Sequence, residues 1–253
     1  MKHIESNHPW ARLTPSTLVI FALAHFLSGC RTTTTVDEYR VTNTTFAEND
    51  TIVVLGRRHD MEKDTEHDFI QCVGRTLDSS SSHLNVIPEA EFVDALYPWF
   101  EISTAPMDVA NLDELVKNPM VAAKFNELRV RYFVWIDGFT KTTDRAGSVT
   151  CVVGPGGGGC LGFKTWDDEA NYEAAIWDLS NIKIAGKINT ETAGTSFVPA
   201  VIIPVPLLAR VKATACNAMA TQLSSFIVGD IGDSTCNPPV RDRTRSSYKE
   251  CEL

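Results

Sequence analysis

The order of apolar and polar residues predicts alternating strands and helices in the first part of the chain. Two short β-branched runs, residues 51–55 and 84–87, are typical of buried strands. Between them a helix is expected from Thr65, because apolar residues recur on one helical face. A second helix begins after Pro88, and a third follows Asn118, which supplies a cap directly before a proline.

The second part of the chain predicts more strands and one long helix. Residues 131–136 are apolar on both faces, as expected of a central strand. Another strand is expected at residues 148–153, and residues 174–179 and 183–190 have the pattern of a hairpin. A long helical pattern over residues 206–228 ends at a glycine. A membrane hairpin needs strands of about 10 residues with alternating polarity, and because no such pair is evident, a membrane hairpin is not expected.

This order of elements predicts an α/β (α+β) fold, with a single mixed sheet and helices packed on its face. Strand–helix alternation comes first and a meander follows, which is typical of such a sheet. We expect the domain to span residues 51–229. Residues 1–29 are expected to be a signal peptide, residues 30–50 a lipidated cysteine with a polar tether, and residues 230–253 a C-terminal tail.

The first thirty residues have the parts of a secretory leader. A polar beginning with two basic residues precedes an apolar run, residues 17–27, that is too short to span a hydrocarbon core needing about 20 residues. Residues 27–30 read Leu-Ser-Gly-Cys, which resembles the bacterial lipobox. The resemblance implies that Cys30 is lipidated and that cleavage occurs before it. Because Arg31 rather than aspartate follows, it also implies the outer membrane, facing the periplasm. An ordinary signal peptide with a coincidental cysteine is the alternative.

Charge excludes two kinds of partner. The chain has 23 basic and 32 acidic side chains, a formal net charge of -9. A nucleic-acid-binding protein needs a basic face, so no nucleic-acid partner is expected. Adhesion to anionic lipid through basic residues is equally disfavoured. Attachment to a membrane must therefore come from a covalent lipid or from apolar residues.

The chain has six cysteines besides Cys30, an even number that predicts disulfides in an oxidising compartment. Local spacing indicates three pairs: Cys151–Cys160, Cys236–Cys251 and, by elimination, Cys72–Cys216. The first pair brackets a glycine-rich segment that can turn back on itself, and the second brackets a polar tail. The third lies on the apolar stripes of two predicted helices. Zinc binding is the competing interpretation, but Cys-x-x-Cys spacing is absent.

Several segments resemble a known envelope domain. Residues 51–55 look like its opening strand, residues 126–138 like its block from a helix end to a strand that reaches glycine, and Asp178 like the residue that opens its late hairpin. A final helix closes the domain. This layout resembles the domain shared by the curli-secretion lipoproteins, the penicillin-binding-protein activator lipoproteins and the amino-terminal domain of the Tol translocation protein. Such domains bind other proteins, so the resemblance implies an accessory role without chemistry.

The chain departs from that family at three places. Gly56 and Arg57 stand where the family has Pro-Phe after the first strand. The glycine-rich loop between Cys151 and Cys160 is an addition, and so is the apolar stretch over residues 197–208. These departures leave the family's mode of action open for this chain.

One acidic segment is a candidate metal site. His59, Asp60, His67 and Asp68 bring imidazoles and carboxylates close together in sequence, as a divalent metal would require. The alternative, which we favour, is a solvated acidic loop that leads into a helix cap. Accordingly no metal, no cofactor and no catalytic residue is predicted. A periplasmic metal-binding or hydrolytic lipoprotein is the competing function.

One apolar segment is a candidate interaction site. Residues 197–208 contain three prolines and no charge, and they include Phe197, Val201, Ile202 and Ile203. Proline removes backbone donors, so a central strand is disfavoured here. Either the segment lies in a groove of its own domain, or it forms a patch that faces a partner or lipid. Together these features predict a lipid-anchored, non-enzymatic accessory or assembly factor that contacts an envelope protein.

Overall fold

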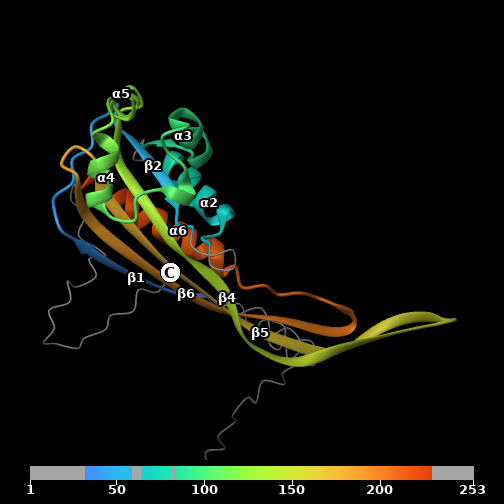
Figure 1. Ribbon diagram of the computed structural model, residues 1–253. Helices are drawn as coiled ribbons and strands as arrows, with labels where there is room; N and C mark the ends of the chain where they lie inside the picture. The colour runs from blue at the N-terminus through green and yellow to red at the C-terminus, as the bar shows by residue number, and fades with distance from the viewer. Residues whose placement is uncertain (1–31, 59–63, 81–83, 230–253) are drawn as a thin grey trace, which may run out of the picture.

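The fold is a single mixed sheet, seen in the computed structural model, which describes residues 32–58, 64–80 and 84–229. The strand order is β1-β6-β5-β4-β2-β3 (Figure 1). The strands are β1 Thr32–Arg40, β2 Thr51–Gly56, β3 Asn85–Ile87, β4 Val130–Gly154, β5 Gly157–Asp178 and β6 Lys183–Pro204. β2 pairs in parallel with β3 and β4, and the other neighbours pair antiparallel. The predicted α/β fold is confirmed.

Helices cover both faces of one half of the sheet. They are α2 His67–Asp78, α3 Glu89–Leu96, η1 Ile102–Thr104, α4 Val109–Val116, α5 Pro119–Glu127 and α6 Val211–Val228. α2 and α6 pack on the face that carries Ile52 and Tyr132. α3, α4 and α5 pack on the opposite face, which carries Val53 and Phe133. Because successive strand residues point to opposite faces and both faces are covered, residues 52–55 of β2 and 132–136 of β4 are continuous apolar runs.

Local signals fix most element boundaries. Asn118 caps α5 as predicted, since its side chain accepts a hydrogen bond from the Met120 amide at 3.0 Å. The helix expected from Thr65 begins two residues later, because the Thr65 hydroxyl donates to the Ile136 carbonyl at 3.1 Å. The last helix begins at Val211 rather than at residue 206, because residues just before it lie beside β6.

The hairpin predicted around Ser180 and Asn181 is confirmed and is held by one carboxylate. Asp178 accepts hydrogen bonds from the Ser180 amide at 2.9 Å and from the Asn181 amide at 3.2 Å. The Arg131 guanidinium meets the same carboxylate with both of its terminal nitrogens, at 2.5 and 3.0 Å. Both side chains are largely buried, so this pair ties the start of β4 to the β5–β6 turn.

The structure corrects the expected tether at residues 30–50. Residues 32–40 form β1, which pairs with β6 from Thr32↔Gly194 to Arg40↔Gly186. The run of threonines fits an edge strand, because threonine is β-branched and its hydroxyl is satisfied by water or by a neighbour. Here the hydroxyls of Thr34 and Thr192 form a hydrogen bond of 2.9 Å. The sheet therefore begins two residues after Cys30.

The strands also correct the sequence analysis. Residues 131–136 and 148–153 belong to one strand, β4, of 25 residues, and β5 has 22. The two separate short strands expected at these places are therefore wrong, and the structure has one long β4–β5 hairpin instead. The polar residues between the two apolar runs continue the same ladder, with a bulge between Thr142 and Arg145. Backbone pairing continues across a stretch in which side-chain polarity gives no signal.

The end of β2 explains one departure from the family pattern. A β-carbon on Gly56 would lie 2.0 Å from Cδ1 of Ile70, so a larger residue there would have to displace the Ile70 side chain. The Arg57 guanidinium lies 3.9 Å from the ring centroid of Trp135 and donates to the Pro106 carbonyl at 2.6 Å. Burial lowers the pKa of Arg57 to about 10, so this side chain stays charged while it joins β2 to the loop before α4.

Two of the three predicted disulfides are present. Cys72 of α2 is bonded to Cys216 of α6, and Cys151 of β4 is bonded to Cys160 of β5. The first bond staples the two helices on one face of the sheet. The predicted Cys236–Cys251 pair lies outside the residues described.

Candidate functional site

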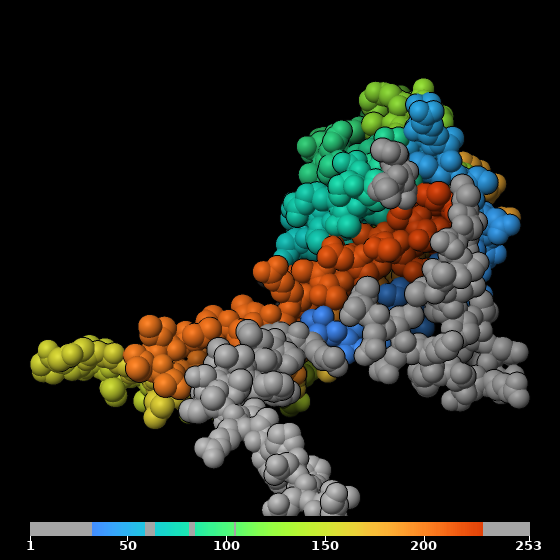
Figure 2. Space-filling view, turned by 180° about the vertical axis from the view of Figure 1, so that it is seen from behind, coloured from blue at the N-terminus to red at the C-terminus, as the bar shows by residue number. Residues whose placement is uncertain are grey.

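The most distinctive feature of the molecule is a sheet arm that leaves the helix-covered body. Past the level of Gly194, β1 ends, and three strands continue alone. We call residues 141–154, 157–169 and 195–204 the arm. Figure 1 shows the arm extending from the body, and Figure 2 shows the same projection from behind.

The root of the arm is fixed to α2 by a buried tyrosine. Tyr172 stacks on Phe69 with ring centroids 3.5 Å apart. Its hydroxyl donates to Glu66 at 2.5 Å and lies 2.8 Å from the Thr140 hydroxyl. Burial raises the pKa of Tyr172 well above its ordinary value, and the hydrogen bond to Glu66 raises it further. The phenol therefore stays protonated and keeps donating, which holds the arm at a defined place.

A charged collar follows the root. Its charged residues are Lys141, Asp144, Arg145, Lys164, Asp167, Asp168 and Glu169. Asp168 accepts from the Trp166 indole at 3.0 Å and from the Thr142 hydroxyl at 2.7 Å. Lys141 pairs with Glu169 at 3.2 Å. Asp167 and Glu169 are two residues apart on β5 and therefore share a face, whereas Asp168 lies on the other face.

Beyond the collar the arm has no charged residue. We call the two uncharged segments, residues 146–163 and 195–208, the tip; residues 195–198 of the second segment pair with the collar, and its last four residues follow β6. The tip carries nine of the eighteen large apolar side chains that stand exposed in the described part of the chain. They are Val152, Val153, Leu161, Phe163, Val201, Ile202, Ile203, Val205 and Leu208. An exposed apolar surface of this size, far from the core, is typical of a contact site.

The predicted interaction residues lie in this tip. Val201, Ile202 and Ile203 are 75%, 70% and 69% exposed, whereas Phe197 is half-buried with its ring 6.1 Å from that of Phe163. The segment was expected either to lie in a groove of its own domain or to form an exposed patch. The three aliphatic residues form an exposed patch.

Proline was expected to disfavour a central strand at this place, and in the arm β6 is an outer strand, because its pairing with β1 ends at Gly194. Pro199 lies within β6 opposite Phe163. The Val205 amide donates to the Pro199 carbonyl at 3.0 Å, so the Pro199 backbone faces the outer side of β6. The missing amide hydrogen therefore removes no bond to β5.

The two edges of the arm differ. On the β6 side the chain turns back, and Phe197 and Leu207 exchange hydrogen bonds of 2.9 and 2.8 Å. On the β4 side the last residue paired with β2 is Ile136, and no described strand pairs with that edge between residues 137 and 154. The arm therefore presents one covered edge and one open edge.

Of the four weak metal candidates, the structure describes His67 and Asp68. His67 is exposed and lies 2.7 Å from the Gln71 amide nitrogen, while Asp68 pairs with Lys212 at 2.7 Å. His59 and Asp60 lie outside the described residues. Within the part of the chain that is described, no cluster of three histidine, cysteine or acidic side chains could hold a metal.

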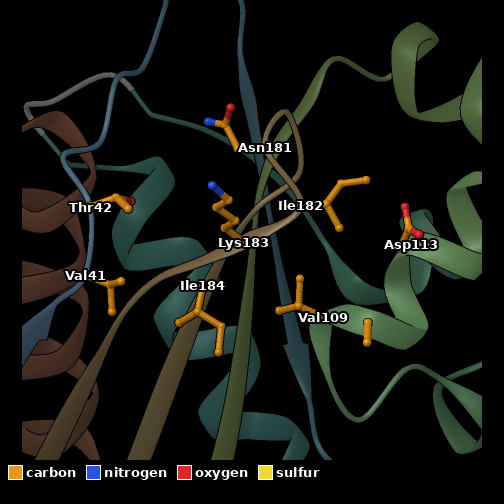
Figure 3. Close-up of a pocket in the computed structure, with 9 residues that line it drawn as sticks. Val41, Thr42, Val109, Asp113, Asn181, Ile182, Lys183 and Ile184 are labelled. Carbon is orange, nitrogen blue, oxygen red and sulfur yellow. The ribbon is translucent and has the colours of Figure 1, made fainter.

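A hollow lies at the end of the sheet away from the arm. It measures about 720 Å³ and is lined by Val41, Thr42, Val109, Ala110, Asp113, Asn181, Ile182, Lys183 and Ile184. Figure 3 shows the 181–184 turn between Val41 on one side and Val109 on the other. Five of its nine lining residues are aliphatic and the others are polar or charged, and the hollow is open to solvent as a surface depression is. None of the helices described is both long and apolar enough to cross a membrane.

Sequence reasoning missed the open edge and the exposed apolar residues of β4 and β5. A signal for them was available, because residues 146–163 contain no charge, as residues 197–208 do not. Cys151 and Cys160 lie directly opposite each other in the ladder, and Cys160 is in turn opposite Ile202. The two uncharged segments are therefore parts of one structure.

Comparison with known proteins adds little. No family model matches the chain, and no curated protein matches it. Two solved structures of PelC from Paraburkholderia phytofirmans, both described as dodecamers, are similar at TM-scores of 0.35 and 0.36. Each is 14% identical and covers 78% of this chain and 100% of its own. A TM-score below 0.5 is too low to support an inference about fold or function.

Proposed function

We propose that this chain is a lipid-anchored protein of the bacterial envelope, held at the outer membrane on the periplasmic side. It acts there as a non-enzymatic accessory or assembly factor that contacts other envelope proteins. The observation that carries the proposal is the open edge of β4 along the arm. An unpaired strand edge is a template on which a partner strand can be added.

The two halves of this open edge differ in how they resist pairing. Near the root, the bulge between Thr142 and Arg145 and the charges of Lys141 and Asp144 oppose indiscriminate pairing. Residues 146–154 have neither a bulge nor a charge. The outer half of β4 is therefore the part suited to a partner strand.

The orientation of the backbone identifies the outward donors. The Cα atoms of Cys151 and Cys160 are 4.0 Å apart, which marks a pair without mutual backbone hydrogen bonds. The amides of Val149, Cys151 and Val153 consequently point away from β5. A partner strand would accept from these amides and donate to the carbonyls beside them.

The proposed anchor fits the position of β1. Thr32 is already in the ladder, so lipid on Cys30 would hold the sheet itself close to the membrane. The leader and the Leu-Ser-Gly-Cys sequence support this anchor. A Cys30→Ala variant should remain an unprocessed precursor or be mislocalised, as followed by membrane fractionation and mass spectrometry. Normal maturation and outer-membrane sedimentation of that variant would overturn the lipid anchor.

The contact is tested by removing one outward donor. Val149→Pro removes the amide hydrogen without breaking the β4–β5 ladder, and Val149→Ala is the matched control that keeps it. Proteins that co-purify with the chain from detergent-solubilised envelopes should be retained by the alanine variant and lost by the proline variant. Equal recovery of the same proteins with both variants would exclude strand addition at this edge.

A further inference from the structure

We propose that the tip of the arm is a second membrane-binding element, inserted into the lipid leaflet that holds the anchor on Cys30. The ligand is the acyl region of a phospholipid bilayer. The inference deepens the proposed function and rests on it in one respect, the lipid anchor. Four observations carry it: apolar residues on both faces, the absence of charge, the collar and the end of the sheet at which the chain enters.

Apolar side chains occupy both faces of the tip. Leu161 and Val201 are directly paired and share one face, on which Phe163 lies two residues further along β5. Ile202, paired with Cys160, lies on the other face, as does Val153, which is 91% exposed. A protein partner that lay against the sheet would cover one face only. A surrounding apolar medium covers both.

The tip also lacks the groups that lipid excludes. Residues 146–163 and 195–208 contain no charged side chain. Placing a carboxylate or an ammonium in the acyl region is strongly unfavourable, so this stretch is compatible with lipid where the collar is not. An uncharged tip of 18 and 14 residues, within a chain of net charge -9, is not explained by solubility.

Three residues of the collar, which also carries four acids, are of the kind expected at a membrane–water interface. Trp166, Lys164 and Arg145 lie together where the uncharged stretch begins, and the Lys164 amine is 6.0 Å from the Trp166 ring. Tryptophan favours the headgroup region, and long basic side chains extend toward phosphates from there. The collar would therefore limit how far the arm enters.

The direction of β1 brings the anchor and the arm to the same membrane. Thr32 is paired with Gly194, where β6 leaves the body for the arm, so the chain enters the sheet from the arm side. Cys30 is two residues before Thr32, which corresponds to at most about 7 Å of chain. From Gly194 to Ile202 the arm extends roughly 26 Å further at the usual rise of a strand. Because the lipid on Cys30 holds the start of β1 close to the membrane, an arm inclined toward the membrane reaches the same leaflet.

The open edge of β4 limits the depth. Unpaired backbone groups are not tolerated in the hydrocarbon core. They are tolerated at the acyl–headgroup boundary, where water still reaches them and where apolar side chains insert by about 5–10 Å. At that depth the side chains on the two faces meet lipid, while the outward amides of β4 stay accessible to a partner strand. We therefore place Val152, Val153, Leu161 and the 201–203 segment at that boundary.

The test uses the oxidised chain from Arg31 onward, which contains every described residue but no lipid. It is mixed with vesicles of phosphatidylethanolamine and phosphatidylglycerol and separated by flotation. We expect the chain to float, and the bound fraction to stay the same between about 0.1 and 1 M salt, because apolar insertion is not screened. Val153→Asp/Leu161→Asp, one change on each face, should weaken binding at least about tenfold.

Tyr39→Asp/Met120→Asp is the matched control, because both residues are exposed but lie on the body. It should float like the unchanged chain, and circular dichroism should show both double variants folded. An unlipidated chain that stays unbound, or equal flotation of the two double variants, would overturn the inference. Neither result touches the Cys30→Ala test, so failure of the tip and failure of the anchor are distinguishable. Loss of co-purified proteins from the arm variant, without vesicle binding by the unchanged chain, would assign the tip to a protein instead.

Discussion

The body and the arm are built from the same three strands, yet they differ in what surrounds them. In the body, β4 and β5 have helices on both faces, and Tyr132, Phe133 and Ile176 are fully buried. In the arm, the same strands continue without a covering layer, and Leu161 is 73% exposed. Strand length in this protein is therefore not set by the core. Backbone pairing carries the strands past the point where burial of side chains ends.

This difference separates stability from contact. Substitutions in the body should alter the free energy of unfolding, because its side chains lose their surroundings when the chain unfolds. Substitutions in the tip should alter binding, because its side chains have no surroundings to lose.

The largest effect is expected at the centre of the body. Phe133→Ala should reduce the free energy of unfolding by about 3–5 kcal/mol, since the Phe133 ring contacts those of Phe92, Phe125 and Trp135. Leu161→Ala in the arm should change it by less than about 0.5 kcal/mol. Urea unfolding of both variants measures the contrast. Similar losses would mean that the arm side chain is buried.

The next largest effect is expected from substitutions in the two hairpin turns, which should differ in how much stability they cost. Asp178→Ala in the body leaves buried Arg131 without its carboxylate and two turn amides without an acceptor, so a loss of about 3 kcal/mol is expected. Gly156→Ala in the turn of the arm should be nearly neutral, because a β-carbon there meets nothing within 4 Å. Thermal unfolding gives both values. A neutral Asp178→Ala would show that the buried pair does not hold the β5–β6 turn.

The two disulfides should act on different regions. Cys72→Ser/Cys216→Ser opens a link between α2 and α6 and should destabilise the body by about 2–4 kcal/mol. Cys151→Ser/Cys160→Ser should lower the local stability of the arm by about 2–3 kcal/mol and that of the body by less than about 1 kcal/mol. Amide hydrogen exchange resolves the two regions. Global destabilisation by the arm variant would show that arm and body unfold as one unit.

The smallest effect concerns pH and the contact between α2 and α6. The hydrogen bond from Lys212 lowers the pKa of Asp68 below its ordinary value of 3.8. A lowered pKa in the folded state gives stability that is present above pH 3.8 and is lost as the pH falls through the lowered value. A double-mutant cycle of Asp68→Asn and Lys212→Met should show a small coupling at pH about 6 that weakens as the pH falls below 3.8 and Asp68 becomes protonated. Coupling that grew on acidification would contradict this pair.

Most of the body could be predicted from the sequence because its signals are local. The apolar run at residues 51–55, the cap at Asn118 and the turn after Asp178 each act within a few residues. Burial on both faces of β2 appears directly as a continuous apolar run. The pairing of Cys151 with Cys160 was also predictable, because the glycines between them allow a tight return.

The arm could not be predicted in the same way because its strands are held by pairing rather than by burial. Residues 137–148 are mostly polar, and their apolar residues do not recur at every second position. The hydrophobic pattern therefore does not predict a strand there. The threonine run of β1 looked like a tether for the same reason, since an edge strand with one wet side needs few apolar residues. Residues 146–163 and 195–208 are separated in sequence, and only the pairing of β5 with β6 shows that these two uncharged segments form one tip.

The sequence alone determined the order of the elements, the α/β class, two of the disulfides and the apolar character of residues 197–208. Each of these depends on residues close together or on composition. Only the tertiary structure decided where the strands continue beyond the helices that cover them. It also decided which edge of the arm stays open and which residues are exposed on its two faces. Those properties depend on register between distant strands, and register is set by the whole ladder and not by any one segment.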